Sequence, residues 1–185
     1  MARPVVTEDG EVAIGEPDRF AAVFDRYYAE IRSYVARRLS VAVADDITAN
    51  AFLAAYRKRD RYDPRQGSVR SWLYGFATRE IGSHRRAELR RYRALARLGA
   101  QPDHAAHPDP LAGELDGRLA AALARLSTGD RHVLLLVALA ELNYAEVAQA
   151  LGLPYGTVCS RLNRARRQLR AVLGAAENHD GDSDG

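Results

Sequence analysis

Cysteine, lysine and long apolar runs are scarce in this sequence, and each scarcity limits what the protein can be. The single Cys159 excludes an intramolecular disulfide and any metal site built from several cysteines. No apolar run is long enough to span a membrane, and the N-terminus lacks the apolar core of a signal peptide. We therefore expect a cytoplasmic protein without membrane insertion. Lys58 is the only lysine, and the excess of arginine fits phosphate recognition as well as a GC-rich genome.

Charge is distributed unevenly along the 185 residues. Residues 18–97 contain 18 basic and nine acidic side chains, whereas residues 1–17 have a net charge of −3 and residues 174–185 one of −4. A basic body suits a polyanionic partner, and we expect the two acidic ends to be solvated, disordered tails.

Helical periodicity is clear in the first half of the chain. Aromatic and apolar side chains recur at helical spacing from Asp18 to Leu39, and we expect them to pack in a core. A second helix is predicted to start near Ala44 and the acids that follow it, which suit a helix N-terminus, and to run to Tyr56. After a polar loop at residues 60–68, Ser68 is predicted to cap a long helix that becomes basic beyond Ile81.

Periodicity disappears at residues 98–109, which we interpret as a flexible linker. Asp109 is predicted to cap the next helix, which Pro110 opens. The apolar stretch 132–140 is predicted to be a further, buried helix. The predicted fold is all-α, with two small helical bundles at residues 18–97 and 110–173.

The stretch from Asn143 to Arg170 has the pattern of a helix-turn-helix. Asn143 can cap a short helix, with Glu146 three residues on to complete a capping box, and Gly152 can end that helix in a left-handed conformation. The second helix has no acid between Tyr155 and Gly174. Its expected core face is Val158, Leu162, Ala165 and Leu169. The competing interpretation is a basic amphipathic hairpin with a solvated face.

One face of this second helix could read base edges in a major groove. The predicted readers lie at i, i+3, i+4 and i+7: Thr157, Ser160, Arg161 and Arg164. Arg167 and Arg170, further along the helix, are expected mainly to contact phosphate.

Two segments resemble the extracytoplasmic-function (ECF) group of bacterial RNA polymerase sigma factors, which keep only regions 2 and 4. The text DDITANAFLAAYRKRDRYDPRQGSVRSWLYGFA resembles region 2, and NYAEVAQALGLPYGTVCSRLNRARRQLR resembles region 4.2. The resemblance implies that the chain directs core RNA polymerase, through its β′ and β subunits, to promoter DNA with a −10 and a −35 element. An anti-sigma factor is the usual regulator of the family, although nothing in the sequence identifies one.

The resemblance also implies roles for individual residues. The helix that docks on polymerase would present Asp45, Asp46, Ile47 and Phe52, with Phe52 shared between docking and core. A base flipped from the −10 element would enter the loop at Tyr62, Asp63 and Ser68. The basic helix would help to melt and hold that DNA through Arg79, Ser83, His84, Arg85 and Arg86.

The chain departs from the usual family pattern in three places, which involve four residues. Ala49 and Asn50 stand where Gln-Glu is usual, which puts the polymerase contact in doubt. Arg79 replaces a frequent Asn in the third helix, which puts the −10 preference in doubt. Cys159 replaces a common Lys and removes one DNA contact.

Two other functions remain as alternatives. A stand-alone helix-turn-helix regulator would bind duplex DNA without polymerase, but it would leave the 60–68 loop and the basic third helix without a role. A nuclease would need a partnered His or metal-ligand spacing around Asp45, Asp46 and Asp63, and the sequence has neither. We therefore expect no catalytic residue, metal, cofactor or small-molecule substrate.

Overall fold

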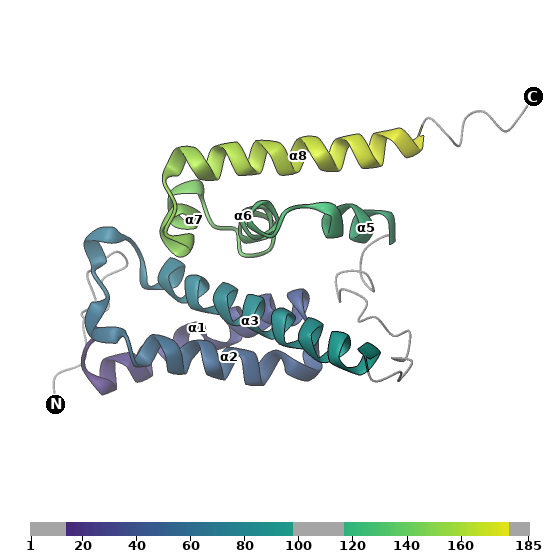
Figure 1. Cartoon of the computed structure of the whole chain (residues 1–185). Helices are drawn as coiled ribbons and strands as arrows, with labels where there is room; N and C mark the ends of the chain where they lie inside the picture. Colours follow the sequence, from purple (N-terminus) through teal and green to yellow (C-terminus); the bar gives the residue numbers. More distant parts are fainter. Residues whose placement is uncertain (1–13, 98–116, 178–185) are drawn as a thin grey trace, which may run out of the picture.

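The computed structural model describes residues 14–97 and 117–177, and every regular element within these ranges is helical (Figure 1). In chain order the elements are α1 (Pro17–Arg38), α2 (Val41–Tyr56), the 3-10 turns η1 (Arg59–Arg61) and η2 (Pro64–Gln66), α3 (Val69–Arg97), α5 (Gly117–Arg125), α6 (Thr128–Leu139), α7 (Tyr144–Leu151) and α8 (Tyr155–Glu177). Helices α1–α3 form one layer and α5–α8 the other (Figure 1). The all-α prediction is confirmed.

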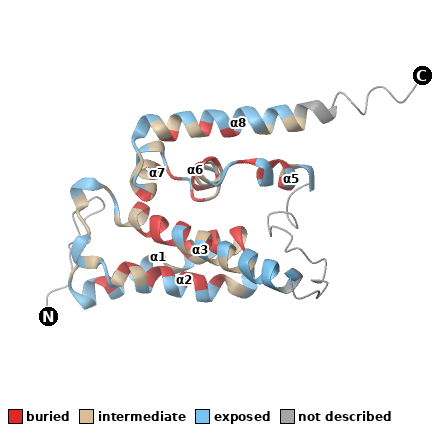
Figure 2. Ribbon diagram, viewed as in Figure 1, coloured by how far each residue is buried: buried red, intermediate tan, exposed pale blue. Residues whose placement is uncertain are grey.

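Aromatic side chains hold α1 against α2. Phe20 and Phe52 are buried, and the ring of Phe20 meets Tyr56 edge-on with 5.3 Å between centroids. Phe24 meets Phe52 in the same way at 5.0 Å but is 39% exposed. Edge-to-face pairs of this kind add to the stability that apolar burial provides. Most of the predicted stripe thus packs in the core, with Phe24 at its exposed edge, and buried residues line the inner faces of all three helices (Figure 2).

Helix α2 begins earlier than the sequence suggests. Its first residue is Val41, after the extended backbone of Ser40, so Asp45 lies in the second turn and cannot serve as an N-terminal acid. The Asp45 carboxylate instead accepts hydrogen bonds from Arg32 Nε at 2.6 Å and from the Tyr28 hydroxyl at 3.1 Å. These bonds hold the pKa of Asp45 below its usual value and link α2 to α1.

The predicted caps are present in both bundles. Asn143 and Glu146 form the complete capping box of α7, and Gly152 ends that helix with a φ of 63°. Ser68 Oγ accepts from the amide of Ser71 at 3.2 Å at the start of α3. Ser127 also caps α6, accepting from the amide of Asp130, which the sequence analysis did not predict. The expected caps and turns are confirmed, except for that at Asp109, which lies outside the described residues together with the linker.

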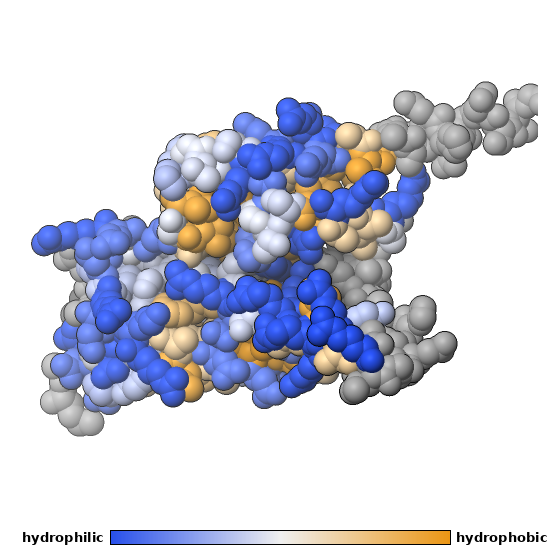
Figure 3. All heavy atoms as spheres, in the orientation of Figure 1, coloured by the Kyte–Doolittle hydropathy of each residue, from blue (hydrophilic) through white to orange (hydrophobic). Residues whose placement is uncertain are grey.

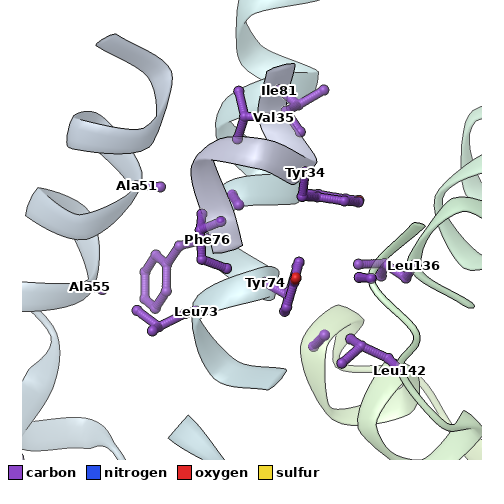
Figure 4. Packing of buried hydrophobic residues seen from close by; sticks show 14 of the residues in the cluster. Tyr34, Val35, Ala51, Ala55, Leu73, Tyr74, Phe76, Ile81, Leu136 and Leu142 are labelled. Carbon is purple, nitrogen blue, oxygen red and sulfur yellow. The ribbon is translucent and has the colours of Figure 1, made fainter. Parts of the chain in front are cut away.

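The two bundles pack against each other through one shared core. Tyr34 and Tyr74 of the first bundle lie in the same buried cluster as Leu136 and Leu142 of the second (Figure 4). Gly75 of α3 faces α7 where the two helices meet.

Two arginines of the first bundle reach carbonyl groups at the end of α6. Arg37 Nη2 donates to the Leu139 carbonyl and Arg70 Nη2 to the Ala140 carbonyl, both at 2.6 Å. Cations at a helix C-terminus are favourable because the helix dipole is negative there. The second bundle is therefore docked on the first, a contact that the sequence pattern did not predict.

We expect Gly75→Ala to open this junction. A methyl group at Gly75 would meet the backbone carbonyl of Ala150 well inside 3.0 Å, and a backbone atom cannot move aside as a side chain can. The variant should show an increased radius of gyration by small-angle X-ray scattering with unchanged helix content.

Gly82→Ala is the matched control in the same helix. Its added methyl would meet only the flexible end of Arg86, at 3.3 Å, and both variants gain similar helix propensity. If the two variants have the same radius of gyration, the close approach at Gly75 does not hold the bundles together.

Candidate nucleic-acid interface

Helix α8 lies across α6 and α7 with one apolar face turned inward. Val158, Leu162 and Ala165 are buried, with exposures of 1% or less, as the sequence predicts. The opposite side is open to solvent, and it contains no acid over its first five turns. Its exposed side chains include Ser160, Asn163, Arg164 and Arg167. A convex, positively charged helix of this kind has the shape and charge to enter a major groove.

The predicted readers do not all face outward. Ser160 and Arg164 are exposed, whereas Thr157 and Arg161 are half-buried at the edge of the face. The Ser160 hydroxyl donates to the Thr157 carbonyl at 3.0 Å. Arg161 lies against Gly129 at the start of α6. The exposed face is therefore rotated away from Arg161.

Asn163 is a candidate reader that the sequence analysis missed. It is exposed one turn after Ser160 and one turn before Arg167. A carboxamide can bond both N6 and N7 of adenine, which makes Asn a base-specific side chain. Its place in the sequence marks it, because Asn163 lies on the side of α8 away from the core face that Val158 and Leu162 define.

The loop between α2 and α3 is prefolded by its own polar side chains. Asp63 accepts from the Arg65 amide at 3.0 Å and from Gln66 Nε2 at 3.1 Å, which lowers its pKa. The Tyr62 hydroxyl donates to the Gly67 carbonyl at 2.9 Å, and burial raises the pKa of Tyr62.

The Tyr62 ring also packs on Trp72, with 5.4 Å between ring centroids. Ser68 caps α3 through its hydroxyl group. Three predicted loop residues, Tyr62, Asp63 and Ser68, thus shape the loop in the free chain.

The five residues of α3 predicted to contact DNA divide into two sets. Arg79, Ser83 and Arg86 are exposed and lie on one side of the helix. Arg85 turns inward and donates to the Arg38 carbonyl at 2.7 Å, while His84 is half-buried and lies 3.4 Å from the Glu88 carboxylate. Hydrophilic side chains gather over α3 and α8 on the face seen in Figure 3. The first set is free to follow a nucleic-acid backbone, as are the exposed Arg90, Arg91 and Arg93 further along α3.

On α2, the apolar residues expected to dock a partner are buried. Ile47 is 7% and Phe52 3% exposed, because both complete the core against α1 and α3, so neither side chain lies on the surface of α2. Asp46 is exposed, and Leu53 is 45% exposed two turns further on. Leu53 is the apolar surface residue that the sequence analysis overlooked.

A cavity of about 190 Å³ lies at the junction of the bundles, between α3 and the ends of α6 and α7. His132 lines it, and burial followed by the charges of Arg38 and Arg85 lowers its pKa to about 4, so the imidazole is neutral at pH 7. Across residues 14–97 and 117–177 no group of three His, Cys, Asp or Glu residues could hold a metal ion. The helices of that part are also too short or too polar to cross a bilayer.

Comparisons with known proteins define the class. The sigma-70 region 2 family matches residues 23–91, and the sigma-70 region 4 family matches residues 116–169. Among curated relatives, the ECF RNA polymerase sigma factor SigC of Mycobacterium tuberculosis is 35% identical over 144 residues, covering 77% of this chain and 76% of SigC. RNA polymerase sigma factor CnrH of Cupriavidus metallidurans is 30% identical over 146 residues, covering 71% of this chain and 73% of CnrH.

Solved structures agree in fold. CnrH in complex with the cytosolic domain of CnrY superposes with a TM-score of 0.58 at 27% identity, covering 88% of this chain and 92% of that one. The sigma factor RpoE of Bartonella quintana, in complex with the anti-sigma factor NepR, gives 0.60 at 25% identity, covering 84% and 96%. This chain therefore belongs to the ECF sigma factors and is an alternative sigma factor of transcription initiation. Sigma factors are initiation factors and not enzymes.

We expect two kinds of response when α8 is altered. Asn163→Ala should relax the preference at one base pair of the duplex, at a cost of about 1–3 kcal/mol for the preferred base. Arg167→Ala should weaken binding to every sequence about equally and lower the salt slope by about one unit. Binding to a randomised duplex library at two salt concentrations measures both. Identical effects of the two substitutions would contradict this docking of α8.

Proposed function

We propose that this chain binds core RNA polymerase and opens a promoter by using two different nucleic-acid surfaces. One observation carries the proposal. The chain combines a basic helix that fits a DNA major groove, α8, with a prefolded loop beside the basic side of α3. A duplex-binding protein needs only the first of these surfaces. The second surface, made by the loop and α3, can bind DNA only after the two strands have been separated.

Helix α8 would read the −35 element as duplex. Its exposed Ser160, Asn163 and Arg164 support base contacts, and Arg167 and Arg170 support contacts to phosphate. Thr157 and Arg161, at the edge of the face, would contribute at the margin of the groove.

The loop and α3 would bind the −10 element as single-stranded DNA. The packed rings of Tyr62 and Trp72 and the hydrogen-bonded Asp63 already order the loop, so it would offer an extruded base a preformed binding edge. Arg79, Ser83 and Arg86 would follow the strand by phosphate pairing. His84 and Arg85 would contribute mainly to the stability of α3, in view of their inward contacts.

Polymerase would dock on the outer side of α2. That side offers exposed Asp46 and Leu53, with Ala49 and Asn50 between them. Asp45 would hold α2 against α1 through Arg32, and Ile47 and Phe52 would support the surface from beneath.

The packed arrangement of the bundles must open for this function. Ser71, next to the loop, hydrogen-bonds Gln149 of α7, so loop and helix-turn-helix are in contact. Positions −35 and −10 lie about 25 base pairs apart, roughly 85 Å at 3.4 Å per base pair. Helix α3 is only about 44 Å long at 1.5 Å per residue. We infer that the free chain cannot engage both elements until polymerase separates its halves.

The proposed function also implies how the chain is regulated, that it does not catalyse a reaction, and where it acts. An anti-sigma partner fits this chain, since the similar sigma factor RpoE was solved in complex with the anti-sigma factor NepR. The chain would supply no catalytic group, and it would act in the cytoplasm at the nucleoid. The alternative of a stand-alone regulator leaves the loop and the outer side of α3 without a role.

Promoter opening should depend on core polymerase. The chain alone should bind its promoter weakly, because its halves are docked and nothing in it separates strands. Addition of core polymerase should make thymines near the −10 element reactive to permanganate.

Asp46→Arg should abolish that reactivity without loss of helix content, because it reverses a charge on the proposed docking side. Asp25→Arg, a reversal at an exposed site on α1, is the matched control and should retain it. Reactive thymines without core polymerase, or tight duplex binding with no opening when core is present, would overturn the proposed function.

A further inference from the structure

The start of α6 lies beneath α8 and touches the two candidate guanine-reading arginines of that helix. Arg164 Nη1 donates to Asp130 Oδ2 at 3.4 Å. Beside it, a Cβ atom placed on Gly129 would lie 2.5 Å from Arg161 Nη1, so the Arg161 side chain passes across the glycine. The first turn of α6 thus contacts both arginines, but in different ways.

Of the two residues at the start of α6, Asp130 needs its contact with α8 more than Gly129 does. Its side chain is 2% exposed, and a carboxylate that is withdrawn from water is costly unless it is paired. Among the side chains of residues 14–97 and 117–177, Arg164 is the partner that the structure gives it. The Asp130 amide is bound to Ser127 Oγ at 3.2 Å, which fixes the turn that holds the carboxylate. The pair therefore ties the Arg164 side chain to a rigid helix end.

The pairing leaves Arg164 able to bind a base. Its side chain remains 50% exposed, and a guanidinium has five N–H donors, of which Asp130 uses one at Nη1. The remaining donors include a forked pair of the kind that binds O6 and N7 of guanine. An unrestrained arginine would lose side-chain entropy on entering a groove, and one already held loses less.

We propose that Asp130 is a positioning residue for base recognition: it holds Arg164 so that the free edge of the guanidinium faces guanine in the −35 element. The proposal rests on the proposed function, in which α8 reads that element. Asp130 itself touches no base. Arg161, packed over Gly129, supports the edge of the groove and is not the guanine reader.

The test uses the full chain assembled with core polymerase and two promoters that compete in one sample. The promoters differ only at the −35 base pair where Arg164→Ala removes the preference for guanine. Because both compete for the same folded molecules, the ratio of complexes does not depend on how much of a variant is folded. Asp130→Asn should reduce this ratio roughly fivefold or more. It should leave the ratios at other −35 positions unchanged.

Two further variants separate positioning from mere stability. In the Arg164→Ala background, Asp130→Asn should change the ratio no further, because no guanidinium is left to position. Ser127→Ala, which loosens the turn but keeps the carboxylate, should lower the melting temperature and reduce the ratio less than Asp130→Asn does. Gly129→Ala should leave the ratio intact, because it disturbs Arg161 alone.

The outcomes that would overturn the proposal are distinct from failure of the proposed function. If Asp130→Asn weakens all −35 sequences equally, or acts equally with and without Arg164, Asp130 has only a structural role. If Arg161→Ala removes the guanine preference and Arg164→Ala does not, the wrong arginine has been assigned. If the wild-type holoenzyme shows no −35 preference at all, the proposed function itself fails.

Discussion

The contact between α3 and the second bundle is the constraint on which the rest of this structure depends. Tyr34 and Tyr74 bury their rings in the same cluster as Leu136 and Leu142, while Arg37 and Arg70 bond the last carbonyls of α6. The apolar part follows the hydrophobic effect, and the charged part neutralises a helix end. Together they bring α8 and the loop between α2 and α3 into one compact body.

The same contact is suited to being temporary. Arg70 also pairs with Glu30 at 2.6 Å, so part of its interaction persists inside the first bundle when the halves separate. Arg37 can return to water at little cost, because charged groups are well solvated there. A partner that binds each bundle separately would expose both proposed DNA-binding surfaces. To do so it has to break only the contact between the two bundles. The closed chain is therefore consistent with a protein that acts only in complex with polymerase.

Local signals in the sequence predicted local structure well. The capping box of Asn143 and Glu146, the left-handed Gly152 and the Ser68 cap each depend on residues within four positions of one another, and all are present. The all-α class followed from the periodicity of the apolar positions. The start of α2 was missed because Asp45 looked like an N-terminal acid, whereas its partner Arg32 lies on another helix.

Features that depend on tertiary contacts were not predictable in this way. The helical pattern of α2 does not show that Ile47 and Phe52 are unavailable for docking, because α1 and α3, which cover them, are other parts of the chain. The buried Asp130, the partner of Arg164, lies 34 positions away along the chain and has no pattern that marks it. The exposed side of α8 could have been found as the face opposite Val158 and Leu162, which would have selected Asn163 from the sequence.

Run-off transcription with core polymerase on a genomic library, with every transcript start mapped, tests the central claim most directly. The account predicts discrete starts that appear only when this chain is added. Upstream of each start there should be a shared two-part motif with a fixed spacing between its −35 and −10 elements. Starts that do not change on addition of the chain, together with tight binding of the free chain to a single duplex site, would contradict it.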